Sequence, residues 1–119
     1  TKDWELIKAL QPENNDAILD KNRYNAFHGT GLDESLKYIK VEELIITGVL
    51  TNCCCETTAR DAFIRDYRVF FVGDATATVN EELHLASLNN LAFGFSHIVS
   101  TDQVCGWMGE KMEMMENEF

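Results

Sequence analysis

Short apolar runs alternate with stretches of helical periodicity along most of the chain. Four runs rich in aliphatic and aromatic residues have the length and composition of buried strands. They occupy residues 17–19, 44–47, 69–72 and 97–99, and Gly73 and Asp74 are expected to end the third. Apolar side chains at helical spacing occupy residues 32–40, 54–66 and 81–95. Strands that alternate with helices predict an α/β fold, here a Rossmann-like parallel sheet in a three-layer α-β-α arrangement with helices on both faces.

The two ends of the chain depart from this alternation. Residues 4–10 have the pattern of a helix that stops near Pro12, and no strand precedes them. A three-layer domain of this kind normally begins with a central strand, so we expect the first strand to be missing. Residues 103–119 place methionines and Trp107 at roughly helical spacing among glutamates. We assign residues 1–104 to the α/β domain and 105–119 to an acidic, Met-rich tail that packs on the domain, frays or binds a partner.

Composition narrows the class of protein. The 119 residues suffice for one domain with a core, and 45% hydrophobic and 25% charged residues are typical of globular proteins. No apolar run approaches the length of a membrane span, and no signal-peptide pattern opens the sequence. A formal net charge of -10 argues against a nucleic-acid-binding surface.

Cysteine usage points to a reducing compartment. Three of the four cysteines are consecutive, which suits neither a disulfide framework nor the paired spacing of a zinc site. We therefore expect a cytoplasmic protein with reduced thiols, no metal site and no cofactor.

The cysteine triplet lies between a predicted strand and a predicted helix. Residues 48–55 read Gly-Val-Leu-Thr-Asn-Cys-Cys-Cys, and the helical pattern starts within them. Ligands bind at the carboxyl edge of open α/β sheets. The N–H groups and dipole of a helix N-terminus favour an anion there, so a thiol at that point is biased toward its nucleophilic thiolate. The pattern predicts a reactive cysteine in this turn.

Four sequence blocks, in order, carry a family resemblance. The first block, residues 20–32, contains Asp-Lys-Asn-Arg-Tyr-Asn-Ala-Phe followed by Gly-Thr and Leu, and the second, residues 45–55, holds the cysteine turn. The third block, residues 57–63, reads Thr-Thr-Ala-Arg-Asp-Ala-Phe. The fourth, residues 73–84, contains Gly-Asp-Ala-Thr-Ala-Thr, then Glu and His. Together they resemble the isochorismatase-like cysteine hydrolases, which include nicotinamidases, N-carbamoylsarcosine amidohydrolases and isochorismatases. The resemblance covers roughly residues 5–104. It implies hydrolysis of a small amide or ureido substrate through a thioester intermediate, by an enzyme that commonly assembles into homo-oligomers.

The resemblance also implies roles for individual residues. The family pattern has a threonine, two further residues and then the nucleophile, and this spacing from Thr51 selects Cys54. Lys21 corresponds to the catalytic lysine, whose ammonium stabilises a thiolate. The backbone amides of Leu50 and Cys54 correspond to the oxyanion hole, beside a cis peptide bond between Val49 and Leu50.

Other residues in the four blocks carry open alternatives. Tyr24 and Phe27 either wall a substrate pocket or pack in the core. Asp74 is expected to cap the following turn, and His84 is expected to cap or pack rather than to catalyse.

The third member of the family's triad has no counterpart among the aspartates near the start of the chain. The resemblance places that aspartate, a general base and proton donor, on the first strand. Asp3 precedes a predicted helix, whereas Asp16 and Asp20 belong to the lysine strand. The sequence thus leaves two functions open. The chain is an amidohydrolase, inactive by itself if that aspartate is absent, or a catalytically incomplete module with a structural or interaction role.

Overall fold

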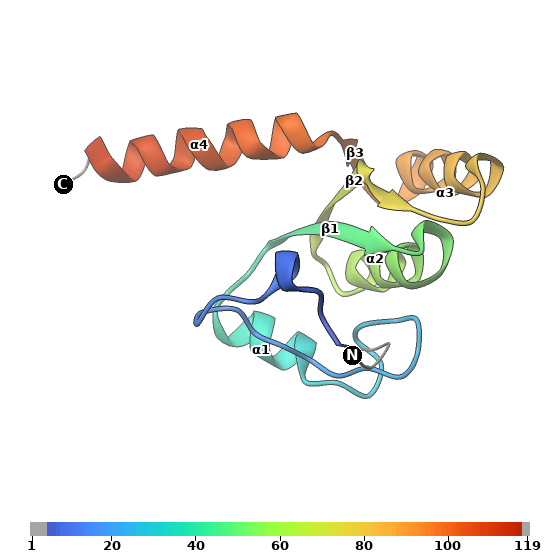
Figure 1. Cartoon of the computed structure of the whole chain (residues 1–119), viewed down its shortest axis with the longest axis horizontal. Helices are drawn as coiled ribbons and strands as arrows, with labels where there is room; N and C mark the ends of the chain where they lie inside the picture. Colours follow the sequence, from blue (N-terminus) through green and yellow to red (C-terminus); the bar gives the residue numbers. More distant parts are fainter. Residues whose placement is uncertain (1–4, 118–119) are drawn as a thin grey trace.

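A three-stranded parallel sheet with strand order β1-β2-β3 organises the computed structural model, which describes residues 5–117. The elements are a 3₁₀ turn η1 (Lys8–Leu10), α1 (Leu32–Tyr38), β1 (Glu43–Val49), a π-helical turn η2 (Thr51–Cys55), α2 (Glu56–Ile64), β2 (Arg68–Ala77), α3 (Glu81–Gly94), β3 (His97–Val99) and α4 (Thr101–Asn117). Each strand is followed by a helix, as the sequence pattern predicts (Figure 1).

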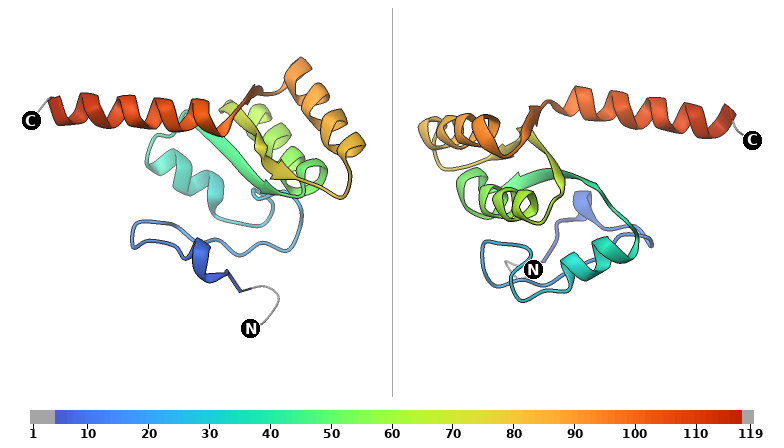
Figure 2. Two further views of the ribbon diagram at one scale, coloured as in Figure 1. Left: turned by 45° about the horizontal axis from the view of Figure 1, so that its top comes forward. Right: turned by 180° about the vertical axis from the view of Figure 1, so that it is seen from behind.

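Side chains of β2 alternate between two separate cores. Val69 and Phe71 lie in one cluster with buried residues of α2 and α3, whereas Phe70 and Val72 lie in a second cluster with Val104 of α4. Successive residues of a strand point to opposite faces of its sheet. Helices α2 and α3, which contact each other (Figure 2), therefore cover one face, and the start of α4 covers the other. The predicted α/β fold with helices on both faces of a parallel sheet is confirmed.

The predicted end of the third strand at residues 73–74 is wrong, because β2 continues through a bulge. The register between β1 and β2 shifts near Gly48, where residues 72–75 leave the ladder with β1. Across this bulge the Thr76 hydroxyl donates a hydrogen bond to the Val72 carbonyl at 3.1 Å. The bulge frees carbonyls and side chains of β2 to contact α3 and α4.

Two elements predicted before residue 20 also differ. Residues 17–19 pair with no strand in the described part of the chain, and Ile18 is 66% exposed, so neither a ladder nor burial holds them as a strand. Of the predicted helix at residues 4–10 only η1 forms, without a side-chain cap or a buried residue to stabilise it. Trp4, like Asp3, lies outside the described residues.

Helix α1 is shorter than predicted. It ends at Tyr38, and Lys40 has a φ of 59°, which no α-helix accommodates. The division of the chain at residue 104 into a domain and a tail stays a prediction.

Helix α4 begins at a cap supplied by the β2 bulge. The amide and the hydroxyl of Thr101 both donate to one carboxylate oxygen of Asp74, each at 2.8 Å. These hydrogen bonds hold the pKa of Asp74 below its ordinary value. Asp74 therefore caps the start of α4, a distant helix, rather than the turn directly after it that the sequence suggested.

Tyr67 links α1 to the core and gives a titratable probe of that packing. Its hydroxyl donates to Asp33 of α1 at 2.7 Å, and its ring stacks on Phe27 with centroids 6.0 Å apart. Burial, followed by the hydrogen bond to the Asp33 carboxylate, raises the pKa of Tyr67 to about 12. Because the ordinary value is about 10, the stability this group contributes is complete below that pH and is lost as pH rises toward about 12.

We expect Tyr67→Phe to remove the last phenolate to appear in an alkaline absorbance titration of the folded chain. The variant should also lose part of the alkaline destabilisation that the wild type shows between about pH 10 and 12. Tyr38→Phe, at a position 88% exposed, is the matched control and should leave the last step in place. If both variants remove the same step of the absorbance titration, the hydrogen bond between Tyr67 and Asp33 does not raise the pKa of Tyr67, and the prediction is wrong.

Candidate active site

The cysteine turn begins where β1 ends. The peptide bond between Val49 and Leu50, the bond that the family resemblance singles out, is cis. The chain then passes through η2, in which the Leu50 carbonyl accepts from the amides of Cys53 and Cys55, both at 3.2 Å. Cys54 therefore lies in a wide turn between strand and helix, and the helix predicted to start at this residue starts at Glu56 instead.

The three consecutive cysteines occupy different environments. Cys55 is buried, and burial raises the pKa of its thiol to about 11, so it stays protonated at neutral pH. Cys53 and Cys54 are half-buried. The Lys21 ammonium lies 3.5 Å from the Cys54 sulfur, and in the described part of the chain it is the only side chain with a hydrogen bond to that sulfur. Of the three consecutive cysteines, Cys54 is therefore the one whose sulfur contacts a cationic side chain in the described part of the chain.

The segment that carries Lys21 is anchored on α2. Lys21 also donates to the Arg23 carbonyl at 3.0 Å, which tightens its own loop. Just beyond, the Ala26 amide donates to the Thr58 hydroxyl at 3.0 Å, and the Asn25 side chain donates to Asp61 at 2.6 Å. Helix α2 thus follows the cysteine turn and also holds the lysine loop, which explains why these sequence blocks occur together.

A cleft of about 320 Å³ opens beside the lysine and is lined by residues 21–24. Tyr24, predicted at the substrate pocket, belongs to this lining and is 60% exposed. For Phe27 the sequence left pocket lining and core packing open. The residue is only 5% exposed and lies in the core, with the Arg65 guanidinium 4.9 Å from its ring centroid. Of the two aromatic residues, only Tyr24 therefore faces the cleft.

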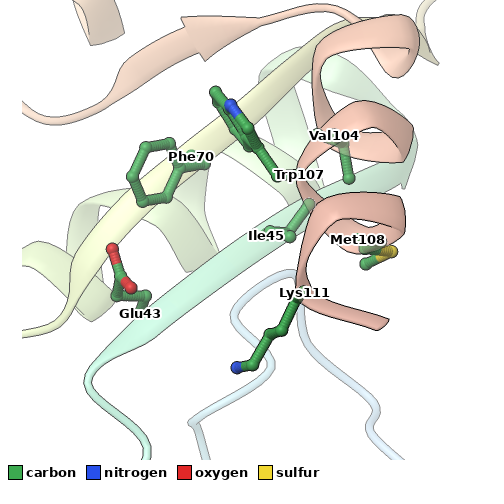
Figure 3. A pocket seen from close by; sticks show the side chains of 7 residues that line it. All are labelled: Glu43, Ile45, Phe70, Val104, Trp107, Met108 and Lys111. Carbon is green, nitrogen blue, oxygen red and sulfur yellow. The ribbon is translucent and has the colours of Figure 1, made fainter. Parts of the chain in front are cut away.

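A second groove, of about 440 Å³, lies between α4 and the sheet (Figure 3). Its lining includes Glu43, at the opposite end of β1 from the cysteine turn, together with Phe70 and Trp107, whose rings meet edge to face at 5.6 Å. This groove is separate from the cysteine site.

His84 contacts the cysteine turn, whereas the sequence favoured capping or packing over catalysis for it. Its Nδ1 lies 2.8 Å from the Thr51 hydroxyl, and its Nε2 lies 3.1 Å from the Gly73 carbonyl. The capping function in this helix belongs to Asn80, which accepts from the Leu83 amide at 2.9 Å. The only signal for His84 in the sequence was its place in the fourth block.

A comparison with known families decides what kind of domain this is. The family model of the isochorismatase domain matches residues 1–103. The chain belongs to the isochorismatase domain family. The family resemblance found in the sequence is therefore confirmed.

Individual relatives of this isochorismatase-family chain agree. Nicotinamidase 3 of Arabidopsis thaliana is 54% identical over 106 residues, covering 87% of this chain and 54% of that protein. Ureidoacrylate amidohydrolase of Methylobacterium radiotolerans is 40% identical over 97 residues, covering 81% of this chain and 38% of that protein. The solved structure of an isochorismatase-like hydrolase from Alkaliphilus metalliredigens superposes with a TM-score of 0.82 at 36% identity, covering 87% of this chain and 57% of that one. The chain thus spans roughly half the length of these relatives, or less.

Two further observations concern the part of the chain that the structure describes. None of its helices has the length and apolar character needed to cross a membrane. None of its histidine, cysteine and acidic side chains form a group of three or more suited to holding a metal ion.

Proposed function

We propose that this chain carries the nucleophile site of a cysteine-dependent hydrolase that acts on small amide or ureido substrates. The observation that supports it most is the 3.5 Å contact between the Lys21 ammonium and the Cys54 sulfur, beside a cleft that opens to solvent. The names of two relatives, a nicotinamidase and a ureidoacrylate amidohydrolase, supply the substrate classes.

In the proposed reaction the Cys54 thiolate attacks the carbonyl carbon of the substrate. The carbonyl oxygen becomes an oxyanion, for which the amides of Leu50 and Cys54 are the proposed donors. This pair is the one that the family resemblance implies, and the amides of the two cysteines that flank Cys54 donate to the Leu50 carbonyl. The C–N bond then breaks, ammonia or an amine leaves with a proton, and a thioester remains on Cys54. Water hydrolyses the thioester to release the acid and regenerate the thiol.

The leaving amine needs a proton, and this step separates the two functions that the sequence left open. Lys21 is the only described side chain with a hydrogen bond to the Cys54 sulfur, and its ammonium is engaged with the Arg23 carbonyl. Without a proton donor, the tetrahedral adduct of an amide would expel the thiolate again. Such a chain would react with alkylating agents and activated esters but would not hydrolyse an amide, which is the behaviour expected of the incomplete module. Cytoplasmic location, homo-oligomerisation and a substrate-binding role for Tyr24 remain proposals.

Alkylation of the folded chain with iodoacetamide across a range of pH, followed by peptide mapping, tests the nucleophile. We expect Cys54 to react fastest and at the lowest pH, at least about tenfold faster than a free thiol at slightly acidic pH. Cys105 on α4 is exposed and serves as the internal reference. If Cys53 or Cys55 reacts first, the choice of Cys54 is wrong, and if Cys54 matches Cys105 throughout, the site is not assembled.

A panel of small primary amides and ureido acids, with ammonia as the readout, then tests turnover. Release of ammonia by the wild-type chain and not by Cys54→Ala supports the amidohydrolase. Fast alkylation of Cys54 without ammonia from any member of the panel supports the incomplete module instead.

A further inference from the structure

Three segments that are distant in sequence meet at the imidazole of His84. The ring projects from α3, contacts Thr51 in the cysteine turn through Nδ1, and contacts Gly73 in the β2 bulge through Nε2. A carbonyl oxygen can only accept, so Nε2 carries the hydrogen and donates it to Gly73. In the neutral ring Nδ1 is then the acceptor, and the Thr51 hydroxyl is its donor.

The Thr51 side of this arrangement is fully buried. Thr51 has no exposed surface, and it is the first residue of η2, directly after Leu50. A buried hydroxyl without a partner costs about 1–3 kcal/mol, so the acceptor on His84 determines where this residue can sit. Since η2 is a single turn, a shift of Thr51 moves Cys54 as well.

The Gly73 side fixes the imidazole in turn. A Cβ at Gly73 would meet the Leu88 side chain of α3 at 3.4 Å and the Ile98 side chain at 3.5 Å. These are ordinary van der Waals distances, so α3 packs directly against the bulge, and the Gly73 carbonyl lies within hydrogen-bond reach of His84.

We propose that His84 is a positioning residue for the nucleophile: held by Gly73, it accepts from Thr51 and so keeps Cys54 beside Lys21. This inference rests on the proposed role of Cys54. His84 acts through Thr51, and the described contacts give it no hydrogen bond to the cysteine sulfur.

Two substitutions of the histidine separate its two hydrogen bonds. In His84→Asn the side-chain oxygen can take the place of Nδ1 as acceptor for Thr51, whereas in His84→Gln the amide nitrogen can take the place of Nε2 as donor to Gly73. Because the Thr51 bond does the positioning, we expect His84→Gln to slow alkylation of Cys54 about tenfold or more and His84→Asn to retain most of the rate. Thr51→Val should match His84→Gln, and Thr51→Ser, which keeps the hydroxyl, should stay within about twofold of wild type.

His97→Asn is the matched control for loss of an imidazole. His97 stacks on Phe70 of β2, with ring centroids 5.2 Å apart, and does not hydrogen-bond to the bulge or to the cysteine turn in the described contacts. His97→Asn should leave the rate and the pH profile of Cys54 alkylation unchanged, whatever its effect on the melting temperature. Deuterium exchange of the amides of residues 50–55 gives a second readout that does not depend on thiol chemistry. We expect faster exchange there in His84→Gln and Thr51→Val, and no change in His97→Asn.

Each outcome bears on the proposal. Unchanged alkylation and unchanged exchange in Thr51→Val and His84→Gln overturn it, even if both variants melt at a lower temperature. Faster exchange with unchanged alkylation of an activated Cys54 also overturns it, because the turn would then loosen without moving the thiol. If wild-type Cys54 is no more reactive than Cys105, the proposed function fails by itself, and exchange over residues 50–55 decides whether His84 holds the turn.

Discussion

Replacing Cys54 by serine is expected to lower acyl transfer from an activated ester by about a thousandfold or more. With p-nitrophenyl acetate, the thiolate sulfur bonds to the acyl carbon, the C–O bond breaks, and p-nitrophenolate leaves with the electron pair. This leaving group needs no proton, so the reaction reports the nucleophile even if the chain has no proton donor. A serine hydroxyl at the same position is scarcely ionised at neutral pH. The Cys54→Ser variant should therefore show no burst, that is, no rapid initial release of p-nitrophenolate.

The matched control for this prediction is Cys53→Ser. Cys53 is also half-buried in η2, and its substitution changes the same atom by the same amount, one residue away. We expect the burst to persist with a rate within a few-fold of wild type. If the burst disappears in Cys53→Ser and persists in Cys54→Ser, the nucleophile is Cys53, and the proposed site is wrong by one residue.

The fold was predictable where local pattern and packing agree. The β3 strand was found at its observed bounds, and α3 within one residue at its end, because a short apolar run marks the strand and apolar side chains at helical spacing mark the helix. The strand predicted at residues 17–19 failed for a different reason. Apolar character alone does not make a strand, since the ladder partner is a property of the assembled sheet and not of the run itself.

The candidate site divides in the same way. The choice of Cys54 among three cysteines came from spacing within a motif, and the contact with Lys21 is in keeping with it. The β2 bulge was missed because Gly73 and Asp74 carry turn chemistry that equally well ends a strand. The role we propose for His84 depends on that bulge, since its Nε2 finds a free carbonyl only where β2 leaves the ladder with β1. The contact of His84 could therefore not be predicted from the sequence without first predicting the β2 bulge.

Lys21→Met is expected to reduce alkylation of Cys54 at neutral pH by about 10- to 100-fold and to shift the reaction to higher pH. Methionine keeps an apolar stem of similar length and removes the charge that lies 3.5 Å from the sulfur. The ester burst should fall by a similar factor, because both reactions draw on the thiolate.

Arg23→Met is the control that separates the effect of the direct contact between Lys21 and Cys54 from that of the positive charge of the loop as a whole. Arg23 lies in the same loop, and its guanidinium donates to the Asn22 carbonyl rather than to the cysteine. Salt screens charges that lie apart in solvent far more than charges in contact. We therefore expect any effect of Arg23→Met to disappear at high ionic strength and most of the effect of Lys21→Met to remain. Equal losses in the two variants, both removed by salt, would show that the loop contributes only a diffuse positive potential and that Lys21 has no specific role in stabilising the thiolate.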